Sequence, residues 1–257
     1  MTNIYGQDFY KDRHQKTVHS ARTVLSLVLD VLPPLSSAVD FGCGVGTWLS
    51  VLREKGVVEV RGLDGPWVDQ SLLKIPRENF GISDFTKVIQ FDKKYGLAIS
   101  LEVAEHLPSE LAGVFVDSLT NAANFVLFSA AIPFQGGLGH VNEQWPDYWV
   151  NLFAARGYVA LDCVRRRIWN DKDISVWYRQ NILLFVNKNE VKSLINYGAT
   201  ELENHLPFSL VHPDLYLLKM RHVLSGSSVR GSWQMFLEAL KRYLKRKMSD
   251  AGILRGP

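Results

Sequence analysis

Three glycines, Gly42, Gly44 and Gly46, stand at alternate positions in the stretch AVDFGCGVGTWLSVL, residues 38–52. Glycine loses more conformational entropy on folding than any other residue, so this density needs a structural or functional reason. Apolar residues lie on both sides of the glycines. The pattern predicts a buried strand that ends at residue 41, a loop whose backbone approaches a ligand closely, and a helix that begins at residue 47.

Apolar runs and helical patterns alternate along the rest of the chain. The periodicity predicts helices over residues 17–32, 47–55, 108–122 and 145–156. Strands are expected over residues 37–41, 57–63, 87–90, 97–101, 124–130, 158–165 and 181–186. Strands separated by helix-length segments are typical of a mostly parallel sheet with helices on both faces, so we expect an α/β fold.

The composition is that of an ordinary globular protein, with 47% hydrophobic and 21% charged residues and a net charge of +3. So small a net charge does not indicate a polyanion-binding surface, and we expect no specific nucleic-acid partner. The two cysteines, Cys43 and Cys163, form no disulfide framework, and without a CxxC or HxxxH pair we expect no metal site. We recognise neither a signal peptide nor an apolar run of transmembrane length, and therefore expect a cytoplasmic protein.

Acidic residues near the glycine loop indicate which kind of ligand it could bind. The loop lies at the carboxyl edge of the expected sheet, where open α/β folds bind ligands. Asp64 ends the next strand and can accept hydrogen bonds from ribose hydroxyls. The spacing Gly42-x-Gly44-x-Gly46 departs from the GxGxxG of dinucleotide folds, and Asp40 would repel a pyrophosphate but attract a cation. A positively charged nucleoside fits these features, and S-adenosylmethionine is such a molecule.

Several segments resemble class I S-adenosylmethionine-dependent methyltransferases. AVDFGCGVGTW is similar to their first motif, Leu63-Asp64 to the acidic end of their second strand, residues 82–85 to the segment that holds the adenine, and residues 100–107 to the segment after the fourth strand. The resemblance implies a Rossmann-like fold with a seven-stranded sheet over residues 20–187. Residues 1–19 would then form an N-terminal cover over the cofactor, and residues 188–257 a helical C-terminal extension.

The resemblance also implies the cofactor, S-adenosylmethionine, and its contacts. The loop glycines would approach the methionine part, with Asp40 near its ammonium group, and Asp64 would hold the ribose. Asp84 would bind the adenine amino group, and Phe85 would cover one adenine face. The residues expected to contact the cofactor are Asp40, Gly42, Gly44, Gly46, Asp64, Asp84, Phe85, Glu102 and His106.

Two histidines are the candidate catalytic residues. Methyl transfer to a hydroxyl needs a base that takes the hydroxyl proton. His140 lies in GGLGHVNEQW, residues 136–145, and His106 follows the fourth expected strand, so both belong to loops at the cofactor edge. We expect His140 to act as the base or to pin its loop, and His106 to orient the cofactor rather than to act as a base. The acceptor-binding candidates are Asn142, Gln144, Trp145, Tyr148 and Tyr10.

The absence of two motifs excludes some classes of methyl acceptor. The Asp/Asn-Pro-Pro-aromatic segment that serves methylation of base amines is absent, because residues 100–103 (SLEV) stand in its place. The sequence also contains no Pro-Cys pair, whose cysteine is the nucleophile in methylation of the cytosine carbon. The leading hypothesis is O-methylation of a small hydroxylated molecule or a sugar, in glycan or natural-product biosynthesis. The alternatives are N-methylation of a small-molecule amine and a non-catalytic, S-adenosylmethionine-binding subunit that acts with a partner.

Near the C-terminus, residues 232–247 predict a basic amphipathic helix. Such a helix can pack on its own domain, on an anionic membrane surface or on a partner protein. Its apolar face would consist of Trp233, Phe236, Leu237, Leu240 and Leu244.

Overall fold

The structure is a computed structural model, and it describes residues 7–194 and 207–226 together with residues 232, 233, 236, 237 and 240. The chain divides into two compact units. The larger unit, Tyr5–His212, contains the whole sheet; the other consists of Pro213–Pro257 with Met1–Ile4. The predicted boundaries at residues 19 and 187 stay predictions.

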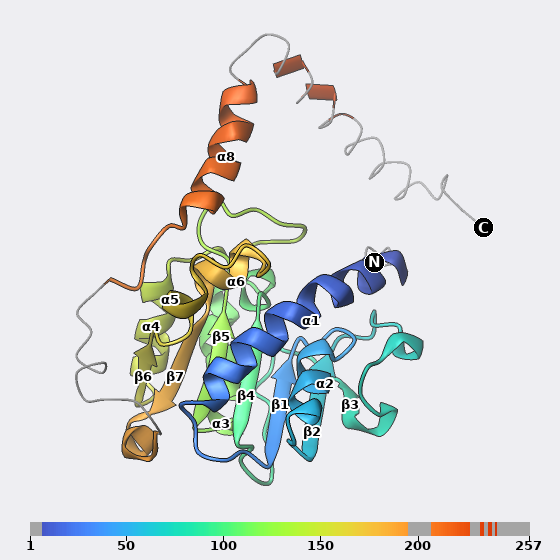
Figure 1. Ribbon diagram of the computed structural model, residues 1–257, viewed down its shortest axis with the longest axis vertical. Coiled ribbons are helices and arrows are strands. Elements are labelled where there is room, and N and C mark those ends of the chain that lie inside the picture. Colours follow the sequence, from blue (N-terminus) through green and yellow to red (C-terminus); the bar gives the residue numbers. More distant parts are fainter. Residues whose placement is uncertain (1–6, 195–206, 227–231, 234–235, 238–239, 241–257) are drawn as a thin grey trace. The chain divides into compact units, whose positions relative to one another are not determined.

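Seven strands form one sheet in the order β3-β2-β1-β4-β5-β7-β6 (Figure 1). The first five run parallel to one another, whereas β7 is antiparallel to both β5 and β6. The predicted seven-stranded, mostly parallel sheet is therefore confirmed. The strands are β1 (Ser37–Phe41), β2 (Glu59–Asp64), β3 (Phe80–Ile82), β4 (Leu97–Leu101), β5 (Phe125–Ser129), β6 (Tyr158–Leu161) and β7 (Leu183–Asn187).

Helices cover both faces of this sheet, as predicted. One face packs against α1 (Gln7–Leu29), α2 (Thr47–Glu54), α5 (Arg165–Ile168) and α6 (Val176–Asn181), whose apolar residues share one core cluster. Figure 1 shows α1 and α2 in front of the sheet. The other face packs against α3 (Ala112–Ala122) and α4 (Pro146–Ala154).

The central strands are buried on both faces of the sheet, which explains why apolar runs in the sequence predicted them. All five residues of β1, of β4 and of β5 are buried. Successive side chains of a strand point to opposite faces, so in β1 Ala38 joins the core beneath α1 while Val39 and Phe41 join the core beneath α3. A strand that is covered on both faces reads as a nearly continuous apolar run, and these three strands contain few polar residues: Ser37, Asp40, Ser100 and Ser129.

Two predicted strands differ from the structure by more than two residues at an end. The strand predicted over residues 87–90 is wrong: the third strand is β3, and residues 83–95 form no strand. The carboxylate of Asp84 accepts hydrogen bonds from both the N–H and the hydroxyl of Thr86, which closes a turn there. The strand predicted over residues 158–165 ends at Leu161, because Asp162 pairs with Arg165 at the start of the short helix α5.

Only part of the C-terminal region is described. Helix α8 (Pro213–Gly226) belongs to the smaller unit. The predicted basic helix over residues 232–247 lies largely outside the described residues; within it, the rings of Trp233 and Phe236 stack at a centroid distance of 5.6 Å. Within the described ranges, no helix is both long enough and apolar enough to cross a membrane.

Candidate active site

The glycine loop joins β1 to α2 at the carboxyl edge of the parallel strands. Gly42, Gly44 and Gly46 all have positive φ angles, of 82°, 54° and 82°. Side chains other than glycine rarely adopt these conformations. A Cβ on Gly42 would come within 2.3 Å of the Val103 side chain, and one on Gly46 within 3.0 Å of Ile75. The backbone path and close packing therefore both require glycine, and the segment after β4 lies directly against the loop.

Asp64 stands at the end of β2, beside the same loop. Its Oδ2 accepts a 2.7 Å hydrogen bond from the Gly44 N–H, and its Oδ1 a 2.6 Å bond from the Gly65 N–H. Burial raises the pKa of Asp64, and these backbone hydrogen bonds oppose the shift because they favour the carboxylate. The carboxylate is thus fixed in position but keeps lone pairs for further donors.

Trp67 is a residue of this site that sequence reasoning missed. Its ring lies over Gly65, since a Cβ on that glycine would stand 2.1 Å from Cη2 of the indole. A hydrogen bond from the Trp67 side chain also favours the ionised form of Asp64. The sequence signal was present as an aromatic residue shortly after the acidic end of the second strand.

Asp40, in β1, is almost fully buried, with 3% of its surface exposed. Burial raises its pKa well above the usual range, and the nearby charge of Asp64 raises it further. Among the described residues, Oδ2 of Asp40 has no hydrogen-bond donor. A buried carboxyl oxygen without a donor suits a cationic ligand, so this side chain fits the ammonium group of S-adenosylmethionine.

The two predicted adenine contacts lie after β3. Asp84 is exposed, and its carboxylate is already held by Thr86, whose hydrogen bonds lower the pKa of Asp84. Phe85 is half-buried, with its ring 5.9 Å from Phe41 and 5.5 Å from Phe115. One of these side chains closes a turn and the other packs into the core, so their contacts with adenine stay predictions.

Glu102 follows β4 in a backbone conformation that few non-glycine residues adopt, with φ at 57°. Its carboxylate accepts hydrogen bonds from Nε2 of Gln135 at 2.7 Å and from Nδ2 of Asn181 at 3.0 Å. Gln135 and Asn181 were not predicted; one lies in the loop after β5 and the other at the end of α6, and no local pattern could bring them together. Glu102 thus ties the segment after β4 to the loop after β5 and to the end of α6.

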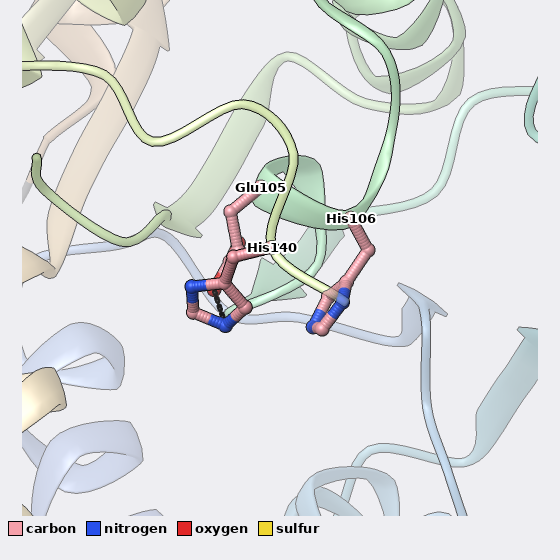
Figure 2. A group of neighbouring side chains, drawn as sticks. All are labelled: Glu105, His106 and His140. Atoms are coloured by element: carbon pink, nitrogen blue, oxygen red, sulfur yellow. Dashed lines mark ion pairs between the residues drawn. The ribbon is translucent and has the colours of Figure 1, made fainter. Parts of the chain in front are cut away.

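Glu105, His106 and His140 form a compact group at this edge (Figure 2). Glu105 and His106 lie in the single turn after β4, while His140 reaches them from the loop between β5 and α4. Nε2 of His140 lies 4.0 Å from Oε1 of Glu105, whose side chain is completely buried. The two imidazole rings meet edge to face with centroids 4.9 Å apart. The structure therefore brings both predicted histidines together around the buried carboxylate of Glu105.

Glu143 orients the imidazole of His140. One of its carboxylate oxygens lies 2.8 Å from Nδ1 of His140 and also accepts the N–H of Gly136 at 2.6 Å. Because a carboxylate only accepts hydrogen bonds, Nδ1 carries a proton, and in the neutral ring the Nε2 lone pair faces Glu105 and His106. Glu143 was missed as a site residue although its spacing of three from His140 places it within reach.

The loop between β5 and α4 and the first turn of α4 carry four of the five predicted acceptor-binding residues. Asn142 is buried and accepts a 3.0 Å hydrogen bond from the half-buried Gln144, whereas Trp145 is 43% exposed where α4 begins. Tyr148 is half-buried, with its ring edge-on to Trp149. Tyr10 lies in α1, and its side chain lies outside the described part of the chain.

The fold and the site together define a class of protein. A mostly parallel sheet of this strand order, with a glycine loop after β1, an acidic residue at the end of β2 and histidines after β4 and β5, is typical of a Rossmann-like, nucleoside-binding α/β enzyme. Residues 12–129 match the family described as methyltransferase domain. This segment is therefore an S-adenosylmethionine-dependent methyltransferase domain, and S-adenosylmethionine is its cofactor.

Solved structures of similar fold include magnesium protoporphyrin IX methyltransferase from Synechocystis PCC 6803 with bound SAH, at 24% identity over 68% of this chain and 83% of that chain, with a TM-score of 0.47. An O-methyltransferase family protein from Burkholderia thailandensis is 10% identical over 70% of this chain and 57% of that one, with a TM-score of 0.49. At these TM-scores neither likeness informs the substrate. A search of curated proteins finds no match.

Proposed function

We propose that this methyltransferase transfers a methyl group to a hydroxyl of a small hydroxylated molecule or a sugar. The observation that carries the proposal is the orientation of His140. Glu143 holds Nδ1 of the ring, which leaves the Nε2 lone pair beside Glu105 and His106 at the cofactor edge. An imidazole held in this way suits the removal of a proton from an acceptor, which a hydroxyl needs during methylation.

The donor is proposed to bind along the glycine loop. Asp40 would pair with its ammonium group, Gly42, Gly44 and Gly46 would let the backbone approach the methionine part, and Asp64 would accept the ribose hydroxyls. The buried oxygen of Asp40 and the remaining lone pairs of Asp64 support these roles. Trp67 would add an apolar wall next to Asp64.

In the proposed reaction, His140 receives the proton that the acceptor hydroxyl loses. S-adenosylmethionine supplies an electrophilic methyl group: one C–O bond forms, the C–S bond breaks with its electrons going to sulfur, and the hydroxyl proton leaves. We propose that activation of the hydroxyl depends on His140, whose Nε2 can receive that proton. His106 lies edge-on to the same ring and would orient the cofactor beside it. An alignment of the reacting atoms supplies the rest of the rate enhancement.

The acceptor is proposed to lie against the loop between β5 and α4. Phe134, Leu138 and Val141 expose apolar side chains from this loop, close in sequence to His140 and Asn142. Apolar and aromatic walls with a few polar groups suit a ring or a sugar that carries hydroxyl groups. Trp145 and Tyr148 would contribute aromatic faces.

The proposal is tested with S-adenosylmethionine labelled with ¹³C in its methyl group. The protein is incubated with a panel of nucleotide sugars, glycosides and phenols, and with a second panel of amines. We expect labelled methoxy products from the first panel, detected by NMR. Labelled N-methyl products alone would overturn the proposal in favour of amine methylation.

A further inference from the structure

Two imidazoles and a buried carboxylate converge at the cofactor edge, and of these only the His140 imidazole takes the acceptor proton in the proposed reaction. One ligand atom from each of Glu105, His106 and His140 lies within 4.8 Å of the other two. We propose that these three side chains bind a divalent transition-metal ion such as Zn²⁺. The inference refines the proposed function and rests on it for the role of the ion, though not for the binding itself.

The distances leave only a small movement for ion binding. A tetrahedral Zn²⁺ with bonds of about 2.0–2.1 Å holds its ligand atoms roughly 3.3 Å apart. Nε2 of His140 and Oε1 of Glu105 lie 4.0 Å apart and the whole group spans at most 4.8 Å. Side-chain rotations of about 1 Å therefore complete the geometry of two histidines and one carboxylate, a ligand set that catalytic zinc sites use.

The surroundings of His140 resemble those of a metal ligand. A histidine that binds a metal through one nitrogen usually donates its other N–H to a carboxylate, which fixes the tautomer and raises the basicity of the ligand. Glu143 makes this contact with Nδ1 at 2.8 Å. The lone pair of Nε2 then faces the Glu105 carboxylate, and both groups can donate electron pairs to a cation placed between them.

The backbone holds the ligands in register. The N–H groups of Val141 and Asn142 both donate to the carbonyl oxygen of Glu105, at 2.9 and 3.1 Å. The segments that supply the three ligands are therefore fixed to each other next to the proposed ion. Gly137 allows the His140 ring to occupy its place, because a Cβ there would stand 2.1 Å from Nε2. A site that is preorganised in this way loses little entropy when the ion binds.

The ion would change how the acceptor is activated. Three protein ligands leave a fourth position open, and a hydroxyl that occupies it loses its proton more readily because the positive charge stabilises the oxyanion. The proton would pass to solvent water. His140 would then act as a ligand of the ion, and the methyl group would still be transferred to oxygen.

Metal binding is measured on the full chain after treatment with a chelator and its removal. Zn²⁺ is titrated by calorimetry, and Co²⁺ is titrated by its visible absorption, which reports nitrogen and oxygen ligation. We expect saturable binding of one ion, lost in both His140→Ala and His106→Ala. Glu143→Gln should bind about 10- to 100-fold more weakly, the usual effect of removing a partner of a ligating histidine.

His19→Ala is the matched control, because His19 belongs to a second candidate group with Asp171 and Asp173 on the same chain. It should bind Zn²⁺ as the wild type does. His106 is exposed, so its variant tests the site even if loss of a buried ligand prevents folding, and far-UV circular dichroism checks each variant. Absence of saturable binding, or binding lost in His19→Ala but kept in His106→Ala, would overturn the inference.

The proposed function and the inference fail in different ways. If protein treated with the chelator binds no ion and methylates a hydroxyl as fast as untreated protein, the metal site is wrong and direct proton transfer to His140 stands. If the ion binds at the three residues but only amines are methylated, the metal site stands and O-methylation is wrong.

Discussion

Glu105 positions His140 twice, once through its side chain and once through its backbone. Oε1 of Glu105 lies 4.0 Å from Nε2 of the imidazole, while the Glu105 carbonyl oxygen accepts two backbone N–H groups from the residues that follow His140. The loop after β5 is therefore attached to the turn after β4 at the point where its histidine enters the site. This attachment links the acceptor-side loop to the segment that contacts the glycine loop through Val103.

The glycine loop gives the first prediction. Gly44→Val should abolish binding of S-adenosylhomocysteine, because a branched side chain would occupy the loop at a φ of 54° and displace the N–H that Asp64 binds. The matched control is Gly56→Val, at a φ of 94° with open space around it. Both variants should lose about 1–2 kcal/mol or more of stability from the left-handed backbone. Calorimetry should find ligand binding only in the control, and retained affinity in Gly44→Val would show that the ligand does not approach this loop.

Asp40 gives a prediction about pH. Its pKa is raised in the folded protein, so the folded state holds this proton more tightly than the unfolded chain does. As pH rises from about 4, the ordinary aspartate pKa, through the raised pKa, this group lowers the free energy of unfolding. Asp40→Asn should therefore flatten the fall in stability of the ligand-free protein over that range. Urea unfolding at a series of pH values measures it, and an unchanged slope would contradict the burial of a titrating Asp40.

The same variant tests the role of Asp40 in binding. Removal of a charged partner from a buried ammonium group should weaken S-adenosylhomocysteine binding by about 10- to 100-fold, since hydrogen bonds to charged groups contribute about 1.5–3 kcal/mol. Asp171→Asn is the control, because Asp171 lies between α5 and α6, outside the predicted cofactor contacts, and its carboxylate accepts the N–H of Asp173. Equal affinities for Asp40→Asn and the wild type would remove Asp40 from the cofactor site.

Gly137 gives a prediction about positioning. In Gly137→Ala the new methyl group would overlap Nε2 of His140, so the imidazole must rotate away while the fold is retained. Turnover should fall by about 10²-fold, the usual effect of a displacement of about 1 Å in a reacting group. Donor affinity should stay the same, which separates displacement from loss of the cofactor site. Gly113→Ala in α3, with its nearest neighbour at 3.4 Å, should retain full activity, and equal losses in both variants would point to a general effect on stability.

The sheet was largely predictable because its central strands are buried on both faces. The bounds of β1 and β4 agree with the predicted ones, since each is an apolar run between polar residues. The edge strand β3 was misplaced because it has only three residues, one of them buried, and leaves no such run. Polar local interactions, such as the turn closed by Asp84, decide the structure there.

The site was predictable only where a single segment carries it. The glycine loop and Asp64 follow from one strand, one loop and the next strand. The contacts among Glu102, Gln135 and Asn181 and those between Glu105 and His140 join residues from segments far apart in the sequence, so local periodicity contains no signal for them. Glu143 could have been found, because a carboxylate three residues after a histidine lies within reach of its imidazole.

The dependence of hydroxyl methylation on His140 is tested most directly by single-turnover kinetics with an acceptor from the panel. His140→Ala should bind S-adenosylmethionine as the wild type does, because the ring lies on the acceptor side of the site. Its rate of methyl transfer to the hydroxyl should fall by about 10²–10⁴-fold, the usual contribution of a positioned base. His106→Ala should instead weaken donor binding together with the rate. An unchanged single-turnover rate in His140→Ala would contradict the proposal that activation of the acceptor depends on this residue.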